Sequence, residues 1–509
     1  MKHTTWILCL ILLLISVVCH LPVLNMPLNV YDEGIILAGA DRILQGQVPY
    51  RDFWSMYPPG QFYTLALLFK LFGPSVLVER IYGIIVRSLL AMSGFLVTKK
   101  LGFSYGAAIV GWAMALLWTV STWFPACPIY MALLVIYASI ALFLHYLGKR
   151  EARWLLWSGL TIALSATFRH DLGGMAAVVM LVALLMIKLT RTEGSWRPMV
   201  TYLGGGLSFG LPVALCFAVT VGIGPIWDQL IATPADVMPR FRWIPYPPYS
   251  FETLAFYLFP IVLGVGFLVS LILILKSKRR DTPAYGLFVL SLTGILFLNQ
   301  VRVRSDEIHL FPAAIAGIVL LPGLVSLLLS LSPKATKIVA FALVVVASAL
   351  FVGRASDWIE SFAERRFVTL ERSTVARAGF ATMDQDLADV IAFIQGNTAE
   401  DEAIYVGVKN HDQFLINDTI IPFLADRPYA TRYHELHPGV TTTADVQKEI
   451  IQELENVPAR LIVLRPGYWV EPNETSIDAG IDLLDRYIAE NYRLVHQVGD
   501  YELWMSRPQ

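Results

Sequence analysis

Three short polar segments, each next to a long apolar stretch, contain the side chains best suited to chemistry. They are Asp32 and Glu33 in "YDEG", Arg169, His170 and Asp171 in "FRHD", and Arg302, Arg304, Asp306 and His309 in "RVRSDEIH". A carboxylate can act as general base toward an attacking hydroxyl, and Arg matches phosphate oxygens and stays charged. These residue types together suit group transfer from a lipid phosphate, with carboxylates activating the acceptor and cations stabilising the departing phosphate.

Each segment also has a structural interpretation. Two acids at the exit of a helix are ordinarily part of a solvated loop. Arg169 and Asp171 can form an ion pair that only joins two helices. The segment 302–309 can anchor the chain to lipid headgroups. The functional interpretation therefore depends on whether the three segments lie on the same side of a membrane.

The composition predicts a polytopic membrane protein. Of 509 residues, 56% are hydrophobic and only 16% are charged, whereas soluble domains contain about 25% charged residues. The charge is unevenly divided, because residues 1–355 hold 26 Lys and Arg against 14 Asp and Glu, and residues 356–509 hold 13 against 26. The chain lacks the basic stripe of a nucleic-acid-binding protein, so no nucleic-acid partner is expected.

Eleven apolar stretches approach the roughly 20 residues that a helix needs to cross a membrane. They are residues 6–24, 76–98, 105–123, 128–147, 154–170, 171–189, 200–221, 253–275, 284–300, 308–331 and 335–353. Only "FRHDLGG" divides the fifth stretch from the sixth. We therefore expect a helical membrane protein with about eleven transmembrane helices.

The positions of Lys and Arg predict the orientation, because these residues are enriched in cytoplasmic loops. With a cytoplasmic N-terminus, the segments on that side hold 15 basic residues and three acids, Glu151, Glu193 and Asp281. All three polar segments then lie on the outer side. Ionisable groups at membrane depth usually face a cavity or a partner. The expected location is the plasma (inner) membrane, with multiple passes and the C-terminal part outside the cytoplasm.

Residues 356–509 are predicted to form an extracytoplasmic α/β domain. "AIYVGV" and "RLIVL" are apolar runs of strand length, and residues 443–456 and 476–491 have helical spacing. No Gly-rich phosphate loop is present. "HELHPG" (434–439) and Trp469 are candidates for acceptor recognition, although ordinary structural roles are the stronger interpretation.

Two further segments of the membrane part have features of an interface. Residues 56–73 begin with a Pro-Pro stop and continue as an amphipathic stretch too short to span. This pattern fits a helix lying in the outer interface and, on composition alone, fits a plain helical hairpin connection equally well. The loop 222–252 mixes Arg240 and Arg242 with aromatic residues, which is typical of a bilayer interface. Arg80, early in the second span, is expected to pair with a nearby acid such as Glu79.

The region around the first polar segment resembles a known family. "YDEG" after the first span, "PYRDF" and "YPPGQFYTLALLFKLFG" in the first outer loop, and the Arg in "LVERIYGIIVRSLL" are similar to the membrane glycosyltransferases of the C-type fold. The similar branch comprises protein O-mannosyltransferases, the lipid A aminoarabinose transferase and bacterial lipopolysaccharide galacturonosyltransferases. The resemblance covers residues 1 to about 350 in layout and is specific mainly near 25–90. It implies a transferase core at 1–355, with its first outer loop at 25–75.

The resemblance implies inverting transfer of one hexosyl or pentosyl unit from a polyprenyl-phosphate sugar to an envelope glycan, lipid or protein. By this likeness, Asp32 is the base, and Glu33 positions the acceptor or stabilises the loop. The expected donor phosphate ligands are Arg302, Arg304, His309, Arg169 and His170. The expected acceptor or loop supports are Tyr57, Asp171, Asp306 and Arg80.

The need for a cofactor stays open at this stage. Some C-type enzymes bind a divalent metal ion through loop acids, and others work without one. The acids that could form such a site are Asp32, Glu33, Asp171 and Asp306.

Other classes of function also stay open. A lipid or ion transporter would favour inverted repeats and polar groups at the membrane midplane, whereas the polar residues here gather at one surface. A sensor would need far fewer spans as an anchor. A glycan polymerase would differ from a single-sugar transferase in its processive products.

Overall fold

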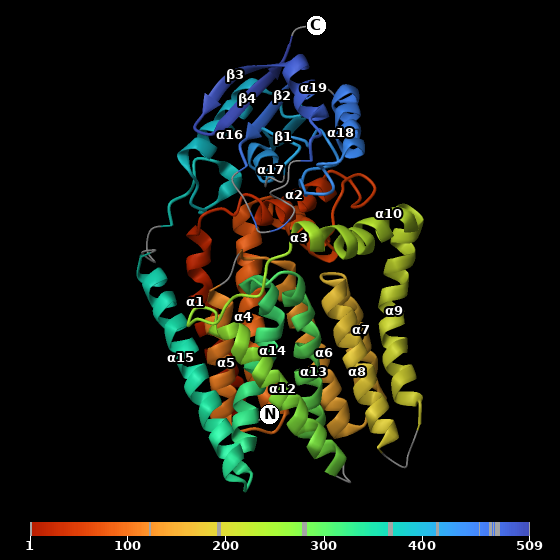
Figure 1. Cartoon of the computed structure of the whole chain (residues 1–509), viewed down its shortest axis with the longest axis vertical. Helices are drawn as coiled ribbons and strands as arrows, with labels where there is room; N and C mark the ends of the chain where they lie inside the picture. The colour runs from red at the N-terminus through yellow and green to blue at the C-terminus, as the bar shows by residue number, and fades with distance from the viewer. Residues whose placement is uncertain are drawn as a thin grey trace.

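The structure is a computed structural model of the chain (Figure 1). It describes residues 3–121, 124–190, 195–276, 282–364, 370–413, 417–457, 459–467, 471, 473 and 479–507. Trp469, one of the residues considered for acceptor recognition, lies outside this set, as does the predicted cytoplasmic acid Asp281.

Every apolar stretch predicted to span forms a helix. The helices are α1 (His3–His20), α4 (Val76–Lys100), α5 (Tyr105–Val120), α6 (Pro128–Lys149), α7 (Ala152–Ala166), α8 (His170–Leu189), α9 (Arg197–Thr220), α12 (Leu254–Lys276), α13 (Thr282–Val303), α14 (Glu307–Ser330) and α15 (Lys334–Glu364). Within the described residues, nine of these helices are long and apolar enough to cross a membrane, and the exceptions are α5 and α7. The other two have 16 and 15 residues. The chain is thus a multi-pass helical membrane protein.

Short elements cover one end of this bundle. They are η1 (Leu21–Asn25), α2 (Asp32–Leu44), α3 (Gly60–Phe72), α10 (Ile223–Trp227), the π-helix η2 (Asp228–Val237) and α11 (Met238–Phe241). Figure 1 shows α2, α3 and α10 between the bundle and the C-terminal region. Helix α3 begins directly after Pro58 and Pro59, as the Pro-Pro stop predicts.

The C-terminal region has the mixed α/β structure that its sequence pattern predicts. Its elements are η3 (Ala376–Ala378), α16 (Gln385–Asn397), β1 (Ile404–Val408), α17 (Ile421–Ala425), α18 (Ala444–Asn456), β2 (Leu461–Arg465), α19 (Leu483–Asn491), β3 (Tyr492–Val498) and β4 (Tyr501–Ser506). The sheet order is β1-β2-β4-β3. Strands β1 and β2 pair in parallel, and β4 pairs antiparallel with both β2 and β3.

The C-terminal region packs directly onto the N-terminal loops. Thr382 exchanges backbone hydrogen bonds with Met26 and Leu28, both 3.2 Å long, and the Trp54 N–H donates to the Arg432 carbonyl at 3.0 Å. The contact is closest at Gly34, where a Cβ would lie 2.2 Å from Thr419 Oγ1. Only glycine fits at this point of "YDEG", so the motif residue is explained by the docking of α2.

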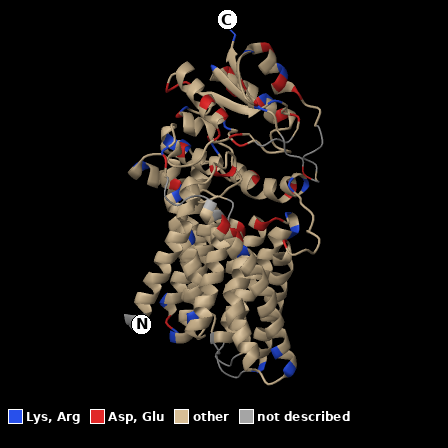
Figure 2. Ribbon diagram, turned by 90° about the vertical axis from the view of Figure 1, so that its left-hand side faces the viewer, with Lys and Arg blue, Asp and Glu red and all other residues tan. Residues whose placement is uncertain are grey.

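Charged side chains gather at the two ends of the bundle. Figure 2 shows red and blue residues where the bundle meets the C-terminal region, and mainly blue residues at the far end. Helix α4 runs between these ends, from Arg80 to Lys100, and Lys100 Nζ lies 3.3 Å from His145 near the end of α6. The residues expected to do chemistry are therefore on the same side of the bundle as the C-terminal region.

A buried ion pair fixes the start of α2 to the start of α4. Arg80 Nε lies 2.9 Å from Glu33 Oε1, and both side chains are 1% exposed. The Arg80 guanidinium also donates to the carbonyls of Val23, Leu24, Met26 and Pro27. Arg80 does pair with an acid, but with Glu33 rather than with Glu79. One side chain thus binds four backbone carbonyls in the segment that joins α1 to α2.

Replacing Arg80 by Met tests how far the fold depends on this pair. The variant leaves Glu33 charged and buried, which costs about 3–5 kcal/mol. We expect a large fall in the thermal unfolding temperature of the protein in lipid nanodiscs. Arg51→Met is the matched control, because Arg51 pairs with Asp52 at 50% side-chain exposure and such pairs contribute about 0–1 kcal/mol. Equal unfolding temperatures for the two variants would contradict the role of Arg80.

Candidate active site

Asp32 lies at the first residue of α2, and Asn29 organises the turn before it. Asn29 Oδ1 accepts the backbone N–H groups of Tyr31 at 3.2 Å and of Asp32 at 2.8 Å. Its own backbone N–H donates to Glu33 Oε2 at 3.1 Å, and its side-chain amide donates to Asp32 Oδ2 at 3.3 Å. These bonds satisfy amides that a helix N-terminus leaves open. The two adjacent carboxylates have different settings, since Glu33 is buried against Arg80 while Asp32 is half-buried.

Charged side chains from several elements influence the hydroxyl of Tyr57. Burial raises the pKa of Tyr57, and the carboxylates of Asp32 and Glu435 raise it further, whereas the Arg169 guanidinium lowers it. These three charges come from α2, from the C-terminal region and from the turn between α7 and α8. The charges of Asp32 and Arg169, two residues singled out in the sequence, therefore act on Tyr57, as does that of Glu435.

The position of Tyr57 follows from the docking of "YPPG" against the end of α7. The Gly60 N–H donates to the Thr167 carbonyl at 2.7 Å, and a Cβ on Gly60 would lie 2.6 Å from that same oxygen. This close approach requires glycine. The contact holds the loop that carries Tyr57 against Thr167. Thr167 lies two residues before Arg169, the N-cap residue of α8.

Arg169 and Asp171 form a bidentate ion pair. Arg169 Nε and Nη2 donate to the two carboxylate oxygens of Asp171 at 3.0 and 2.7 Å. Gln300 on α13 donates to the same carboxylate. This geometry is the structural pairing considered above, and it also orients Arg169, whose side chain keeps 19% exposure. His170 is the first residue of α8, next to this pair.

The third polar segment is tied to the C-terminal region. Arg304 Nη1 and Nη2 donate to the two oxygens of Glu471 at 2.9 and 2.7 Å, and Arg304 Nε donates to Asp306 Oδ2 at 2.7 Å. His309 Nδ1 lies 2.6 Å from Asp306 Oδ1. Arg302 is exposed and donates to Asn299 at 3.0 Å. Most N–H donors of Arg304 thus bind two carboxylates, so few remain to bind a phosphate.

Arg242 connects the two groups of charges. Burial and the Glu435 charge raise the pKa of Tyr31, and the Arg242 charge opposes this rise. The Arg242 charge also helps to lower the pKa of Glu471. Arg242 and Glu471 were missed as site residues by the sequence analysis, and Glu435 was considered only as part of "HELHPG". Arg242 had a signal, since it stands in the aromatic loop assigned to the interface, whereas Glu435 and Glu471 gain meaning only from tertiary contacts.

The segment "HELHPG" lies against α2 rather than on a separate face. The Tyr31 hydroxyl donates to the Leu436 carbonyl at 3.1 Å and lies 3.3 Å from the ring nitrogens of His437. His437 Nε2 is 3.0 Å from Glu435 Oε2, and Glu435 is fully buried. The C-terminal region therefore contributes side chains that contact Tyr31, the residue before Asp32.

The four acids considered for a metal site do not fit such a site. Glu33 pairs with Arg80, Asp171 with Arg169, and Asp306 with Arg304 and His309. Within the part of the chain that the structure describes, no three His, Cys, Asp or Glu side chains are grouped to hold a metal ion. Glu33, Asp171 and Asp306 are instead each paired with a cation.

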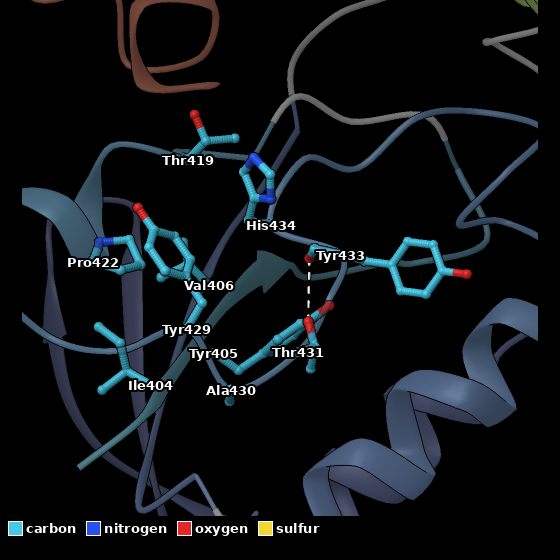
Figure 3. A pocket seen from close by; sticks show the side chains of 10 residues that line it. All are labelled: Ile404, Tyr405, Val406, Thr419, Pro422, Tyr429, Ala430, Thr431, Tyr433 and His434. Carbon is cyan, nitrogen blue, oxygen red and sulfur yellow. Dashed lines mark hydrogen bonds between the residues drawn. The ribbon is translucent and has the colours of Figure 1, made fainter. Parts of the chain in front are cut away.

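A small cavity inside the C-terminal region is excluded as a substrate site. Figure 3 shows its lining, which includes Ile404, Tyr429 and His434. Its volume is about 10 Å³, which is enough for about one water molecule. The chemistry must therefore be sought at the junction of the bundle and the C-terminal region.

Comparison with known proteins identifies the fold. No family model and no curated protein sequence matches the chain. Among solved structures, ArnT from Cupriavidus metallidurans bound to undecaprenyl phosphate matches with a TM-score of 0.57 and 15% identity over 100% of both chains. The apo structure of the same protein matches with a TM-score of 0.57 and 16% identity, again over 100% of both chains. The C-type glycosyltransferase fold expected from the sequence is thereby confirmed.

The junction built by Arg304 and Glu471 is expected to weaken in acid. Burial opposes the charge of Asp306, but hydrogen bonds from His309 and the Arg304 charge hold its pKa at about 2; the pKa of Glu471 is also lowered. Unfolded Asp and Glu titrate near about 3.9 and 4.3. Lowered folded values mean that the stabilisation is complete above about pH 5 and is lost as the pH falls toward 2.

We expect the unfolding temperature to fall between about pH 5 and pH 3, and Glu471→Gln to reduce this pH dependence. At pH 7 the same variant should lose about 1–3 kcal/mol, because Arg304 keeps only part of its charged pairing. Asp445→Asn serves as the control, since the Asp445 side chain is 98% exposed. An unchanged acid profile in Glu471→Gln would exclude this carboxylate as the cause.

Proposed function

We propose that the protein is a membrane glycosyltransferase that moves one sugar from a polyprenyl-phosphate carrier to an acceptor outside the cytoplasm. The carrying observation is that the loop bearing Tyr57, which follows Asp32 and α2, is hydrogen-bonded at 2.7 Å to Thr167, two residues before the ion-paired Arg169, so that a carboxylate and a cation lie at the same end of the bundle. The shared fold supports the proposal, because the similar ArnT structure is one bound to undecaprenyl phosphate. In this proposal, residues 1–355 are the transferase core and 356–509 an extracytoplasmic domain.

The reaction needs one base and one stabilised leaving group. Asp32 takes the proton from the acceptor hydroxyl as its oxygen forms a bond to the anomeric carbon of the sugar. The bond between that carbon and the phosphate oxygen breaks, and polyprenyl phosphate leaves with the electron pair. Attack from the face opposite the phosphate inverts the anomeric centre. The glycosyl-phosphate bond supplies the energy, so the reaction needs no nucleotide.

Arg169 is the main cation for the departing phosphate in this proposal. Asp171 aims its guanidinium without burying it completely, and a pre-oriented Arg adds most to a transition state that develops negative charge. His170, Arg302 and His309 are secondary phosphate ligands. Arg304, which Glu471 and Asp306 already hold, positions the loop. Glu33 and Arg80 hold Asp32 in place, and Tyr57 supports the acceptor.

The orientation in the membrane is part of the proposal. Basic residues that include Lys100 lie at the end of the bundle away from Asp32. Because Lys and Arg favour the cytoplasmic side, that end faces the cytoplasm. The candidate site and the C-terminal region then face outward from the plasma (inner) membrane, where envelope glycans, lipids and proteins are available as acceptors.

Asp32→Asn tests the base. The protein in lipid nanodiscs is supplied with a panel of polyprenyl-phosphate sugars and with extracted envelope lipids and glycans, and release of polyprenyl phosphate is measured. We expect one donor to be consumed, and the variant to be at least about a hundredfold slower, in the range lost with a general base. Single additions to the acceptor distinguish transfer from polymerisation. Turnover by Asp32→Asn at the parent rate, or no consumption of any donor, would count against the proposal.

Arg169→Gln tests the leaving-group cation. Loss of one oriented charge from a phosphate transition state should lower kcat by about 10²–10³, with partial recovery in Arg169→Lys. Arg302→Gln is the matched comparison, because Arg302 is exposed, and its loss should have at least tenfold less effect. Thermal unfolding of each variant separates a folding defect from a catalytic one. A larger effect from Arg302 than from Arg169 would reverse their assigned roles.

A further inference from the structure

A second, larger cavity lies outside the spanning helices and close to the candidate site. It is an open cleft of about 400 Å³ between the segment α10–η2 and the C-terminal region. Trp54 and Gln229 line it from the side of the membrane part, and Arg432, Tyr433 and Val446 from the other. The volume is in the usual range for small-ligand sites, about 300–1,000 Å³.

The segment α10–η2 has two distinct faces. Ile223, Trp227 and Ile231 are 74%, 61% and 39% exposed and follow one another at intervals of four residues. The cleft is lined by a second series with the same interval, Pro225, Gln229, Thr233 and Val237. An exposed apolar face is typical of a helix lying in a membrane interface. The other face is thus turned toward the C-terminal region. Three of its four wall residues, Gln229, Thr233 and Val237, belong to the π-helix, a rare element that often occurs at functional sites.

The cleft is joined to the candidate site by the loop that carries Tyr57. Gln229 accepts the Ser55 N–H and donates to the Tyr50 carbonyl, both at 3.0 Å. The Trp54 ring lies 5.3 Å from that of His437, and His437 is 3.3 Å from the Tyr31 hydroxyl. The rings of Trp54 and His437 thus connect the wall of the cleft to Tyr31, the residue that precedes Asp32.

The lining favours a ligand that is neither a lipid chain nor an ion. Asp228 and Arg432 bring opposite charges, Thr233 and Thr443 bring hydroxyls, and Trp54, Val237 and Val440 bring apolar surface. A lipid chain needs a continuous apolar groove, and the exposed Asp228 carboxylate would repel an anion. Sugar rings have both hydroxyls and apolar faces, so this mixture suits them.

We propose that the cleft binds the saccharide part of the acceptor, at about the size of a disaccharide, beside the loop that carries Tyr57. The inference rests on the proposed transferase function and adds to it the chemical class of the acceptor. The saccharide can belong to a free glycan or to the headgroup of a glycolipid, since the exposed face of α10–η2 puts the cleft next to the bilayer surface.

The test measures hydrogen–deuterium exchange of the full chain in nanodiscs without any donor. The probes are maltose, cellobiose and N,N′-diacetylchitobiose, offered in solution in one arm and attached to a lipid in the nanodisc in the other. We expect at least threefold slower exchange in residues 228–237 and 432–446. Protection in solution identifies a free glycan, and protection only by the lipid-linked probes identifies a glycolipid headgroup.

Three variants make the result specific. Val446→Trp fills the cleft and should abolish the protection, whereas Asp445→Trp adds the same bulk at a 98% exposed side chain and should keep it. Asp228→Ala changes an exposed position and should raise at least tenfold the probe concentration that gives the same protection. This variant replaces Val446→Trp in the test if Val446→Trp does not fold.

The inference is overturned if no saccharide probe protects, if both cleft variants behave as the parent, or if a peptide probe of mixed sequence alone protects. Because no donor is present, these outcomes are independent of the Asp32→Asn assay. Saccharide protection with inactive transferase would contradict the proposed function alone, and donor turnover without saccharide protection would contradict the inference alone.

Discussion

The buried pair of Arg80 and Glu33 is the constraint on which the rest of the site depends. Both charges are removed from water, so each must be fully satisfied, and the guanidinium achieves this by binding Glu33 and four backbone carbonyls of residues 23–27. This arrangement fixes where the chain leaves α1 and where α2 starts. Asp32 has its position because its neighbour is held in this way, so a single dipeptide contains a buried structural carboxylate, Glu33, and the half-buried carboxylate proposed as the base.

Charge pairing also divides the predicted cations into two groups. Arg304 joins α13 and α14 to the C-terminal region through Glu471, whereas Arg169 is oriented by Asp171 and remains partly accessible. A phosphate competes with carboxylates for the same guanidinium donors. The number of carboxylates already bound to each Arg therefore ranks it as a structural or a chemical residue, and this ranking underlies the roles assigned above.

The sequence predicts the helices and strands well because both follow from apolar periodicity. All eleven apolar stretches are helices, and "AIYVGV" and "RLIVL" pair as the parallel strands β1 and β2. That Asp32 and Arg169 lie at the same end of the bundle was predictable once the Lys distribution put both there. Glu435 and Glu471 were not, because nothing local distinguishes a carboxylate that meets Tyr57 or Arg304 from one in solvent. The glycines of "YDEG" and "YPPG" look like turn residues and prove to be points of close contact.

The contact between Tyr31 and Leu436 joins residues 405 positions apart, and it has a consequence for how the protein is made. When the first helix enters the membrane, the residues that enclose Asp32 have not yet been synthesised. Translation must pass "HELHPG" before Tyr31 can meet its partners there. A nascent chain that ends before this segment therefore contains "YDEG" without the contacts that cover it. Contacts between residues so far apart in sequence form slowly, so the covering of this segment belongs to the late steps of folding.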